Sequence, residues 1–539
     1  MATNWATFPV EFKGGLISNM SPLQQGINAI GSATVLQNME PDRRGGYTKI
    51  KGYQAFSSVE VPGAGNILGL KAISSGRAVV ARRIDADAIT DVPALVVGDE
   101  NKTAYYVGTG SGWTHLATSA NTNGGKVYHA SYNFDGDDKT VFVDGTNYPA
   151  IYNSNGNTMS FLTTASPKIN TDLQGAEHVI IFKNTGFYSK GNTLYFSAPY
   201  TVDNFSLADG AGTIAVGNDV TGFAVFRDQL IIFTTDSIKR LTGNTSNDFQ
   251  LTSITDRIGC ISADSIQEFG GDIIYLAPDG IRLLSATDRI GDFALDVASD
   301  TAYKEAEDLL GSSSSFASCI LREKSQYRIF AFSSSQSRGS AKGLIATKFV
   351  SQGSAGIQWS TTKGIKAYIA DSTYSGNNEA IMFSNDDGYV YRMDRGTSFG
   401  SGDGTEIEAI YESPYMPITD PQVRKTAYKL TLYTEPTGNM ELDFRLLFDF
   451  DSGKDTRVVQ PDSITIGETV AGGTGGIAIF GSPTAVFGTA TFGGKLKKVY
   501  NENLIGSFHT VAMRIEDNSK NPTFTLDTAV LEYRQNDRQ

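Results

Sequence analysis

The four histidines and two cysteines of this 539-residue chain are the residues best suited to hold a transition metal. The histidines show no HxH or HExxH spacing and the cysteines form no C-x-x-C pair, which argues against a zinc site. A single histidine such as His178, beside an apolar strand, is expected to be a hydrogen-bonded strand residue. The histidines are His115, His129, His178 and His509.

The two cysteines, Cys260 and Cys319, stand far apart in the sequence. In a reducing compartment, two buried thiols are the expected state, because cytosolic disulfides are rare. A disulfide between them stays open as the alternative.

One Gly-x-Ser-x-Gly match, GTSFG at 396–400, has the pattern of the nucleophile elbow of hydrolases. An elbow needs a strand before the serine and a helix after it, whereas this match runs into SGDG at 401–404, which cannot start a stable helix. We therefore interpret it as a Gly/Ser linker between domains. The sequence contains no GxxxxGK[ST] loop for nucleotide phosphates.

Two acidic clusters, FDGDD at 134–138 and NDDG at 385–388, place carboxylates close together, as a calcium ion prefers. Neither has the ligand spacing of an EF-hand, so we favour solvated turns at both places. Carboxylate pairs for glycoside cleavage form across space and leave no local motif, so a glycosidase or lyase stays open as the enzymatic alternative. We predict no catalytic, cofactor-binding or metal-ligating residue in this chain.

The composition favours strands joined by tight turns. There are 57 Gly, 30 Phe and 24 Tyr, while charged residues make up only 19% of the chain. Apolar residues recur throughout, which argues against disorder. A chain of this length exceeds one hydrophobic core and suits two or three domains.

The formal net charge is −13, so the surface repels nucleic-acid phosphates and argues against DNA binding through a basic patch. No stretch approaches the roughly 20 apolar residues that span a bilayer. The first 15 residues show no basic region followed by an apolar run, so we expect no signal peptide and synthesis in the cytoplasm.

A hairpin pattern recurs along the middle of the chain, in which a turn such as Asp-Gly joins two apolar strands. The turn aspartates Asp144, Asp236, Asp279 and Asp387 are 92, 43 and 108 residues apart, and weaker copies lie inside the two long gaps. Periods of roughly 40 to 50 residues are typical of propeller blades, because small sheets stacked radially bury each other's faces. We predict an all-β fold with a β-propeller of about six blades at 61–400. The clear copies are TVFVDGTNYPAIYN at 140–153, QLIIFTTDSIKRLTG at 229–243, DIIYLAPDGIRLLSA at 272–286 and AIMFSNDDGYVYRMD at 380–394.

Helix is expected only in short segments. AYKEAEDLL at 302–310 contains good helix formers and ends at Gly311, where glycine suits a C-cap. A second candidate is 34–39.

The last part of the chain, 401–539, has longer strands that alternate apolar and polar residues, as at Leu442, Phe444, Leu446 and Phe448. Such alternation predicts a β-sandwich-like domain with one face buried and one face wet. Its Gly-rich stretch at 471–494 is interpreted either as a loop ordered by a neighbouring protein or, equally, as a floppy surface loop.

Three stretches together resemble the tail nozzle, or tail hub and stabilisation, proteins of short-tailed bacteriophages. They are the N-terminal run at 14–53, LYFSAPYTVDNFS at 194–206, and 222–285, which contains FRDQLIIFTTDSIKRLTG, NDF, RIGCISADSI and YLAPDGIRLLS; VLEYR at 530–534 also fits. The residues that carry the resemblance are Gly14, Gly15, Leu16, Asn38, Gly45, Gly46, Gly52, Tyr53, Ser197, Pro199, Phe205, Leu241, Gly243, Phe249, Gly259, Asp279 and Gly280.

The resemblance implies a non-enzymatic virion protein without cofactors, placed below the portal and adaptor of the tail. It implies a homo-oligomeric ring, usually a hexamer, that contacts adaptor or connector proteins and tail fibres or spikes. Double-stranded DNA would pass through the lumen during genome ejection without sequence-specific binding. Residues 1–60 are then expected to be an N-terminal docking segment that closes onto the propeller.

Two alternative functions remain open. One is a propeller-type glycosidase or lyase, and the other is a carbohydrate-binding virion protein. Composition and periodicity by themselves predict a β-propeller of unknown role, because none of the motif residues is chemically reactive.

Overall fold

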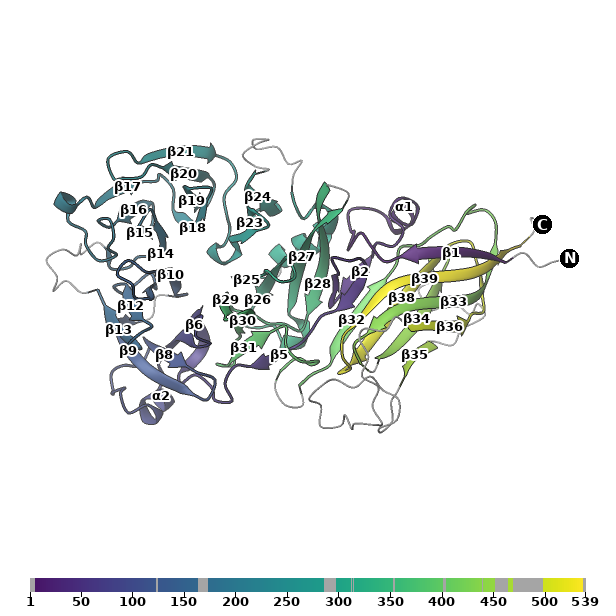
Figure 1. Ribbon diagram of the computed structural model, residues 1–539, viewed down its shortest axis with the longest axis horizontal. Helices are drawn as coiled ribbons and strands as arrows, with labels where there is room; N and C mark the ends of the chain where they lie inside the picture. Colours follow the sequence, from purple (N-terminus) through teal and green to yellow (C-terminus); the bar gives the residue numbers. More distant parts are fainter. Residues whose placement is uncertain are drawn as a thin grey trace.

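The computed structural model describes residues 5–122, 125–162, 173–285, 297–311, 313, 315–351, 354–400, 404–438, 440–450, 464–468 and 498–536. Its described part is nearly all β, with the helices α1 (Pro22–Asn28), α2 (Ala86–Asp91) and α4 (Tyr303–Gly311) (Figure 1). Helix α4 confirms the helix predicted at 302–310. The candidate helix at 34–39 is wrong, because Val35–Gln37 forms strand β2, which pairs with strands far away in the sequence.

Six small antiparallel sheets form separate blades, which confirms the predicted β-propeller of about six blades (Figure 1). Each blade strand except β5 follows its neighbour in the sequence, as hairpin connections require. The blades are β6 (Ala64–Ala72), β7 (Ala78–Arg83), β8 (Lys102–Gly108) and β9 (Trp113–Thr122); β10 (Tyr128–Tyr132), β11 (Lys139–Val143), β12 (Ala150–Asn153) and β13 (Thr158–Phe161); β14 (His178–Phe182), β15 (Thr185–Lys190), β16 (Thr193–Phe196) and β17 (Gly212–Ala215); β18 (Val220–Phe226), β19 (Gln229–Thr234), β20 (Ile238–Thr242) and β21 (Gln250–Thr255); β22 (Gln267–Phe269), β23 (Asp272–Ala277) and β24 (Gly280–Leu283); and β29 (Ile369–Ser375), β30 (Asn378–Ser384), β31 (Val390–Met393) and β5 (Tyr53–Ala55).

A nine-stranded sheet completes the ring of blades and continues into the second part of the molecule. Its first four strands contact the blades on either side through β25, which lies against β22 and β29. Strand β2 pairs in parallel with β28 and antiparallel with β32, so it joins the propeller portion to the rest. The order is β25 (Ser315–Leu321), β26 (Gln326–Phe332), β27 (Lys342–Ser351), β28 (Ser354–Lys363), β2, β32 (Ile407–Glu412), β38 (Val511–Ser519), β34 (Met440–Phe448) and β35 (Ile464–Glu468).

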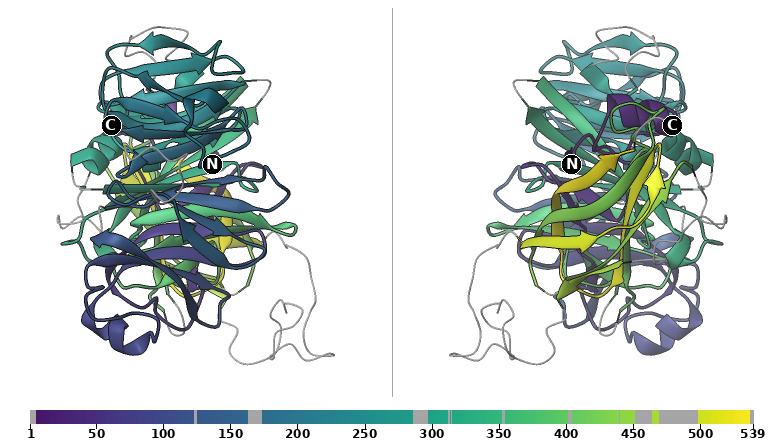
Figure 2. Two further views of the ribbon diagram at one scale, coloured as in Figure 1. Left: turned by 90° about the vertical axis from the view of Figure 1, so that its left-hand side faces the viewer. Right: turned by 90° about the vertical axis from the view of Figure 1, so that its right-hand side faces the viewer.

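A second sheet packs on the far half of the nine-stranded sheet and forms a β-sandwich with it (Figure 2). The alternating residues Leu442, Phe444 and Leu446 are buried, as the sequence pattern predicts. Buried side chains continue from this core to Ile329 and Trp359 of the propeller portion, so the two parts share one apolar core. The second sheet contains β1 (Ala6–Glu11), β3 (Met39–Pro41), β4 (Tyr47–Lys49), β33 (Lys425–Pro436), β36 (Lys498–Asn503), β37 (Ser507–Phe508) and β39 (Phe524–Gln535).

The N-terminal segment is divided between the two parts of the molecule. Strand β5 pairs with β31 and thereby closes the last blade, whereas β1, β3 and β4 belong to the sandwich. The predicted boundary between propeller and sandwich lies near residue 400. Strands from both sides of that boundary, β28 and β32, belong to one continuous sheet, in which β2 lies between them. Local sequence patterns do not encode such long-range pairing, since partner strands here lie more than 300 residues apart.

Asn38 fixes the joint where β2 ends. Its side-chain amide donates hydrogen bonds to the carbonyls of Lys363 (3.0 Å) and Glu408 (2.9 Å), and its oxygen accepts one from the Lys363 N–H (2.9 Å). Its φ of +51° is a conformation that asparagine tolerates better than most residues. One motif residue therefore links both neighbours of β2.

Candidate functional site

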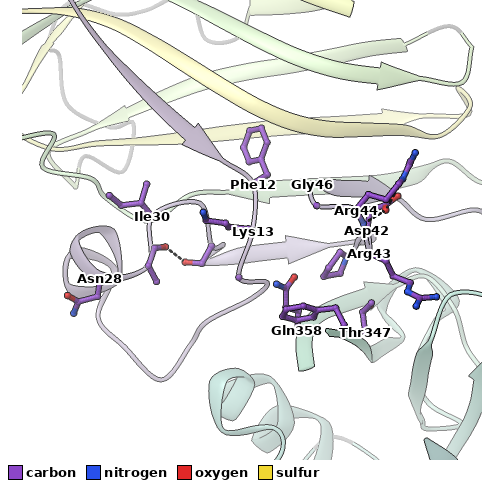
Figure 3. A pocket seen from close by; sticks show the side chains of 16 residues that line it. Phe12, Lys13, Asn28, Ile30, Asp42, Arg43, Arg44, Gly46, Thr347 and Gln358 are labelled. Atoms are coloured by element: carbon purple, nitrogen blue, oxygen red, sulfur yellow. Dashed lines mark hydrogen bonds and ion pairs between the residues drawn. The ribbon is translucent and has the colours of Figure 1, made fainter. Parts of the chain in front are cut away.

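An open cleft of about 550 Å³ lies between the N-terminal run and strands β27 and β28 (Figure 3). We call it the N-terminal cleft. Three of the motif glycines, Gly14, Gly45 and Gly46, line it. The lining residues are Phe12, Lys13, Gly14, Asn28, Ala29, Ile30, Ser32, Pro41, Asp42, Arg43, Arg44, Gly45, Gly46, Thr347, Phe349 and Gln358.

Glycine is required at two places beside the cleft because backbones approach closely there. Gly15 has a φ of +70°, and a Cβ on it would lie 2.9 Å from the Gln358 Cβ. Gly46 has a φ of +90°, and a Cβ on it would lie 2.5 Å from the Leu526 carbonyl oxygen. Both positions therefore hold the N-terminal run tightly against the two sheets.

The buried Tyr47, next to the lining residue Gly46, connects two parts of the N-terminal run. Its hydroxyl accepts a hydrogen bond from the Gly15 N–H (3.0 Å) and donates one to the Gly31 carbonyl (3.0 Å). Burial raises the pKa of Tyr47 well above its usual value, so the hydroxyl stays protonated and keeps its donor. Phe12 packs edge-on against Tyr411 with ring centres 4.8 Å apart, which closes the core below.

The rim of the cleft carries Lys13, Arg43 and Arg44 beside Asp42, and Arg44 also lies 3.6 Å from Glu435. Lys13 pairs with Glu11 (2.6 Å), and Arg44 lies 3.4 Å from Asp42. Arg43 is exposed and has no hydrogen-bond or ion-pair partner among the described residues. Figure 3 shows its side chain directed away from Asp42. The exposed guanidinium can therefore bind a carboxylate of another molecule.

The remaining motif residues hold backbone turns and cores. Ser197 accepts the Gly186 N–H (2.9 Å), Gly243 has a φ of +124°, and Asp279 pairs with Arg282 (2.5 Å). Leu241 is fully buried. The Phe205 ring contacts the Tyr188 ring, and the Phe249 ring contacts the Phe196 ring. At Gly52, Gly259 and Gly280 a Cβ would lie within 3 Å of a neighbouring atom. Leu16 and Tyr53 are buried, and Pro199 lies near Gly210.

A second pocket, of about 350 Å³, lies along the innermost strands β10, β14 and β18. Tyr128, His129, His178 and Phe223 line it, and no described residue that lines it is Asp or Glu. Burial lowers the pKa of both histidines to about 4, so both rings are neutral near pH 7. The His129 ring contacts the Leu70 carbonyl (3.0 Å). The His178 ring, predicted to be hydrogen-bonded, instead contacts the Tyr128 ring with centres 4.5 Å apart.

The carboxylates near the innermost strands are paired with lysines. Lys126 contacts Asp264 (2.8 Å) and two backbone carbonyls, and Lys71 contacts Asp371 (3.2 Å). Burial alone would raise the pKa of Asp371, but the Lys71 charge holds that pKa below its usual value. Both carboxylates are therefore engaged with lysines in this structure.

The two acidic clusters are satisfied by their neighbours. Asp137 accepts hydrogen bonds from Asn153 and Asn155, and Asp138 accepts one from Asn133. In the second cluster, Lys366 pairs with Asp386 (2.6 Å). Among the described residues, no group of three or more His, Cys, Asp or Glu side chains is placed to hold a metal ion.

The Gly-x-Ser-x-Gly match lies against the last blade. The Ser398 carbonyl accepts the Tyr53 N–H (3.2 Å), and the buried Phe399 ring stacks on Tyr53 with ring centres 5.3 Å apart. In the described part of the following chain, Thr405 pairs back with Phe399, which is not the helix of an elbow. The linker therefore serves as a clamp on β5.

Cys260 and Cys319 are free and buried, which confirms the prediction of two buried thiols. Burial raises the pKa of Cys260 to about 11 and that of Cys319 to about 12, so neither is a reactive thiolate. The Gly-rich stretch at 471–494 lies outside the described residues. Among the described helices, none combines the length and the apolar character needed to cross a membrane.

No protein-family model and no curated protein sequence matches the chain. Among solved structures, the extracellular domain of a hybrid two-component system from B. thetaiotaomicron matches with a TM-score of 0.36 and 10% identity. That match covers 62% of this chain and 40% of that protein. The exo-beta-1,3-galactanase from Phanerochaete chrysosporium with galactose matches with a TM-score of 0.27 and 9% identity, over 90% of this chain and 100% of the enzyme. At these TM-scores the likenesses carry no argument about function.

Proposed function

We propose that this chain is a structural component of a short-tailed bacteriophage tail, a nozzle or hub protein that assembles into a ring. The observation that carries the proposal is the N-terminal run at 14–53. Its sequence resembles the opening of that protein family, and its residues both bind the propeller to the sandwich and line an exposed cleft. The N-terminal cleft lies beside the connection between propeller and sandwich. Such a surface suits an assembly protein, since interaction sites are commonly displayed on rigid scaffolds.

In this proposal the ring lies below the portal and adaptor in the virion tail and surrounds the path of the ejected DNA. The partners are other copies of the chain, in a hexamer, together with adaptor or connector proteins and tail fibres or spikes. The net charge of −13 supports a channel through which DNA slides, because acidic walls neutralise few phosphates.

Imaging tests the proposal directly. Virions that carry the chain with an epitope tag are labelled with antibody and viewed by electron microscopy, with untagged virions as the control. Label confined to a ring at the tail supports the proposed function. Label on the capsid, or its absence from virions, contradicts it.

A carbohydrate-binding or glycosidase role is the second candidate, favoured by the pocket that Tyr128 and Phe223 line, since aromatic rings stack on sugars. Cleavage needs two free carboxylates, and Asp264 and Asp371 are engaged with lysines. Incubation with capsular polysaccharide, followed by measurement of reducing ends, separates the candidates. Turnover that is lost in Asp264→Asn would establish the enzyme and overturn the non-enzymatic proposal.

A further inference from the structure

An apolar face borders the N-terminal cleft. Met20, Leu23, Ile27 and Ile30 are 39%, 37%, 58% and 37% exposed, and they recur at spacings of three and four residues on and beside α1. We call these four residues the α1 face. Residues 14–39 contain no charged side chain, whereas the adjoining rim carries Lys13, Arg43 and Arg44. The surface is therefore apolar beside a rim on which Arg43 is exposed and has no partner among the described residues.

A knob of the opposite charge projects from the first blade, at residues 85–100. Val96 and Val97 are 62% and 87% exposed at its tip, while Leu95 is buried and anchors it. We call this segment the α2 knob. It contains no Lys or Arg, and its acidic residues are Asp85, Asp87, Asp91, Asp99 and Glu100.

The α2 knob is a formed structure rather than a loose loop. The Asp85 side chain caps α2 by accepting the Ala88 N–H (2.8 Å). Asp99 accepts the Val96 N–H (3.0 Å) and pairs with Lys102 (2.9 Å), which holds the tip with both valines outward. A preformed apolar tip loses little conformational entropy when it binds.

The knob and the cleft lie on different sides of one chain, with α2 at the end of the propeller away from the sandwich and α1 beside the sandwich (Figure 1). We propose that the α2 knob of one copy docks on the α1 face and N-terminal cleft of the next copy. Val96 and Val97 then contact Leu23 and Ile27, and the knob carboxylates meet Arg43. This head-to-tail contact, which rests on the proposed ring assembly, uses two different surfaces and can close a ring.

Charge complementarity selects a second copy as the occupant. The cleft rim carries Arg43, an exposed cation with no partner among the described residues, on a chain of net charge −13, and the knob joins the exposed Val96 and Val97 to five acidic residues. Two knobs would not pair with each other, because both are acidic and like charges repel.

Disulfide trapping between differently tagged copies tests the contact. One copy carries Val97→Cys and the other Ile27→Cys, and both native cysteines are buried and do not interfere. At about 1 mM protein, above the dissociation constant of most specific contacts, we expect a heterodimer on a non-reducing gel. Val225→Cys, at another exposed valine, serves as the matched control.

Failure of the contact and failure of the proposed function give different results. If the heterodimer does not exceed that of the Val225→Cys control, or if only Ile27→Cys homodimers form, the proposed contact is overturned. A ring at the labelled tail in that case leaves the function in place with another interface. If the heterodimer forms but tails carry no ring, the contact stands and the proposed function fails.

Charge reversal provides the second readout. Arg43→Glu and Asp91→Arg each affect an exposed residue and are expected to reduce cross-linking several-fold. A mixture in which one copy carries Arg43→Glu and the other Asp91→Arg is expected to recover cross-linking, because the reversed charges attract. Recovery equal to that of unmatched mixtures would contradict an electrostatic contact between these surfaces.

Discussion

At the scale of single residues, buried charges hold the joint between propeller and sandwich. Arg328 pairs with Glu40 of β3 (2.8 Å), and Lys324 bridges Glu40 and Asp394 at 2.7 Å each. Burial alone would raise the pKa of Asp394, but Lys324 and Arg328 hold that pKa below its usual value. These ion pairs fix the position of β3 against the propeller, since a displacement of β3 would leave a buried charge without a partner.

The buried pair of Lys49 and Asp517 (2.9 Å) links β4 to β38 across the two sandwich sheets. We expect Lys49→Met to lower the free energy of unfolding by about 3–5 kcal/mol, because Asp517 would stay buried without its counter-charge. Denaturant unfolding followed by circular dichroism measures the loss. The double variant Lys49→Met with Asp517→Leu should recover most of it; a double variant as unstable as the single one would contradict this explanation.

The two histidines of the inner pocket make stability depend on pH. The pKa of His129 and that of His178 are each lowered to about 4 by burial, below the ordinary 6.5. The unfolded chain therefore binds more protons between these values, so stability is lost as pH falls from about 6.5 to about 4. The loss is at most about 3 kcal/mol for each histidine.

Thermal unfolding at a series of pH values checks this dependence. The double variant His129→Gln with His178→Gln should show a flatter decline of the melting temperature below pH 6.5. His509→Gln, at an exposed histidine, is the matched control and should keep the wild-type profile. An unchanged slope in the double variant would show that other groups cause the acid sensitivity.

At the scale of elements, short strands from the N-terminal run close both parts of the molecule. Strand β5 supplies the outer strand of the last blade, and β2 completes the nine-stranded sheet. Tyr53 of β5 contacts Phe383, Tyr391 and Phe399, with ring centres 5.0 to 5.3 Å apart. This closure joins chain segments that are distant in sequence and thereby prevents the ring of blades from opening.

We expect Gly52→Ala to weaken this closure by roughly 2–4 kcal/mol, as a backbone clash in a packed site does. A Cβ there would lie 1.8 Å from the Ser398 carbonyl oxygen, so β5 must move away from its clamp. Gly112→Ala is the matched control, because nothing lies within 4 Å of its Cβ. Limited proteolysis and thermal unfolding measure the effect; equal behaviour of the two variants would contradict it.

At the scale of the whole molecule, an acidic chain carries an exposed Arg43 on the cleft rim beside the apolar α1 face. An acidic chain repels nucleic-acid phosphates. The proposed contact between copies uses the exposed Arg43 and the apolar face beside it. The rigid connection between propeller and sandwich keeps the α2 knob and the N-terminal cleft in a constant relation. Copies joined through these surfaces would therefore repeat one fixed rotation, as a closed ring requires.

We expect the purified chain to show no saturable binding to double-stranded DNA at about 0.1 M salt, because the net charge repels phosphates. Fluorescence anisotropy with a labelled duplex measures this. Arg43→Glu, which removes the unpaired cation of the cleft, should behave as the parent chain does. Binding that weakens steeply with salt would show instead that a basic surface contacts the DNA backbone.

The sequence determined the class of fold and the repeated hairpins, although it misassigned 34–39 as a helix. Alternating strands, Asp-Gly turns and the 40–50-residue period predicted a propeller followed by a β-sandwich, because these signals are local. Helix formers before Gly311 predicted α4, and the expected reducing compartment predicted the buried thiols. The motif glycines Gly15 and Gly46 were recognisable from sequence, although nothing in it indicated which backbones they approach.

Only the tertiary structure decided which distant segments pair. The insertion of β2 between β28 and β32, the capture of β5 by β31 and the cleft with Arg43 on its rim all arise where segments far apart in sequence meet. Such pairing is fixed by edge hydrogen bonds and by complementary burial across the whole molecule. A short strand such as Val35–Gln37 therefore carries too little local information to reveal its partners.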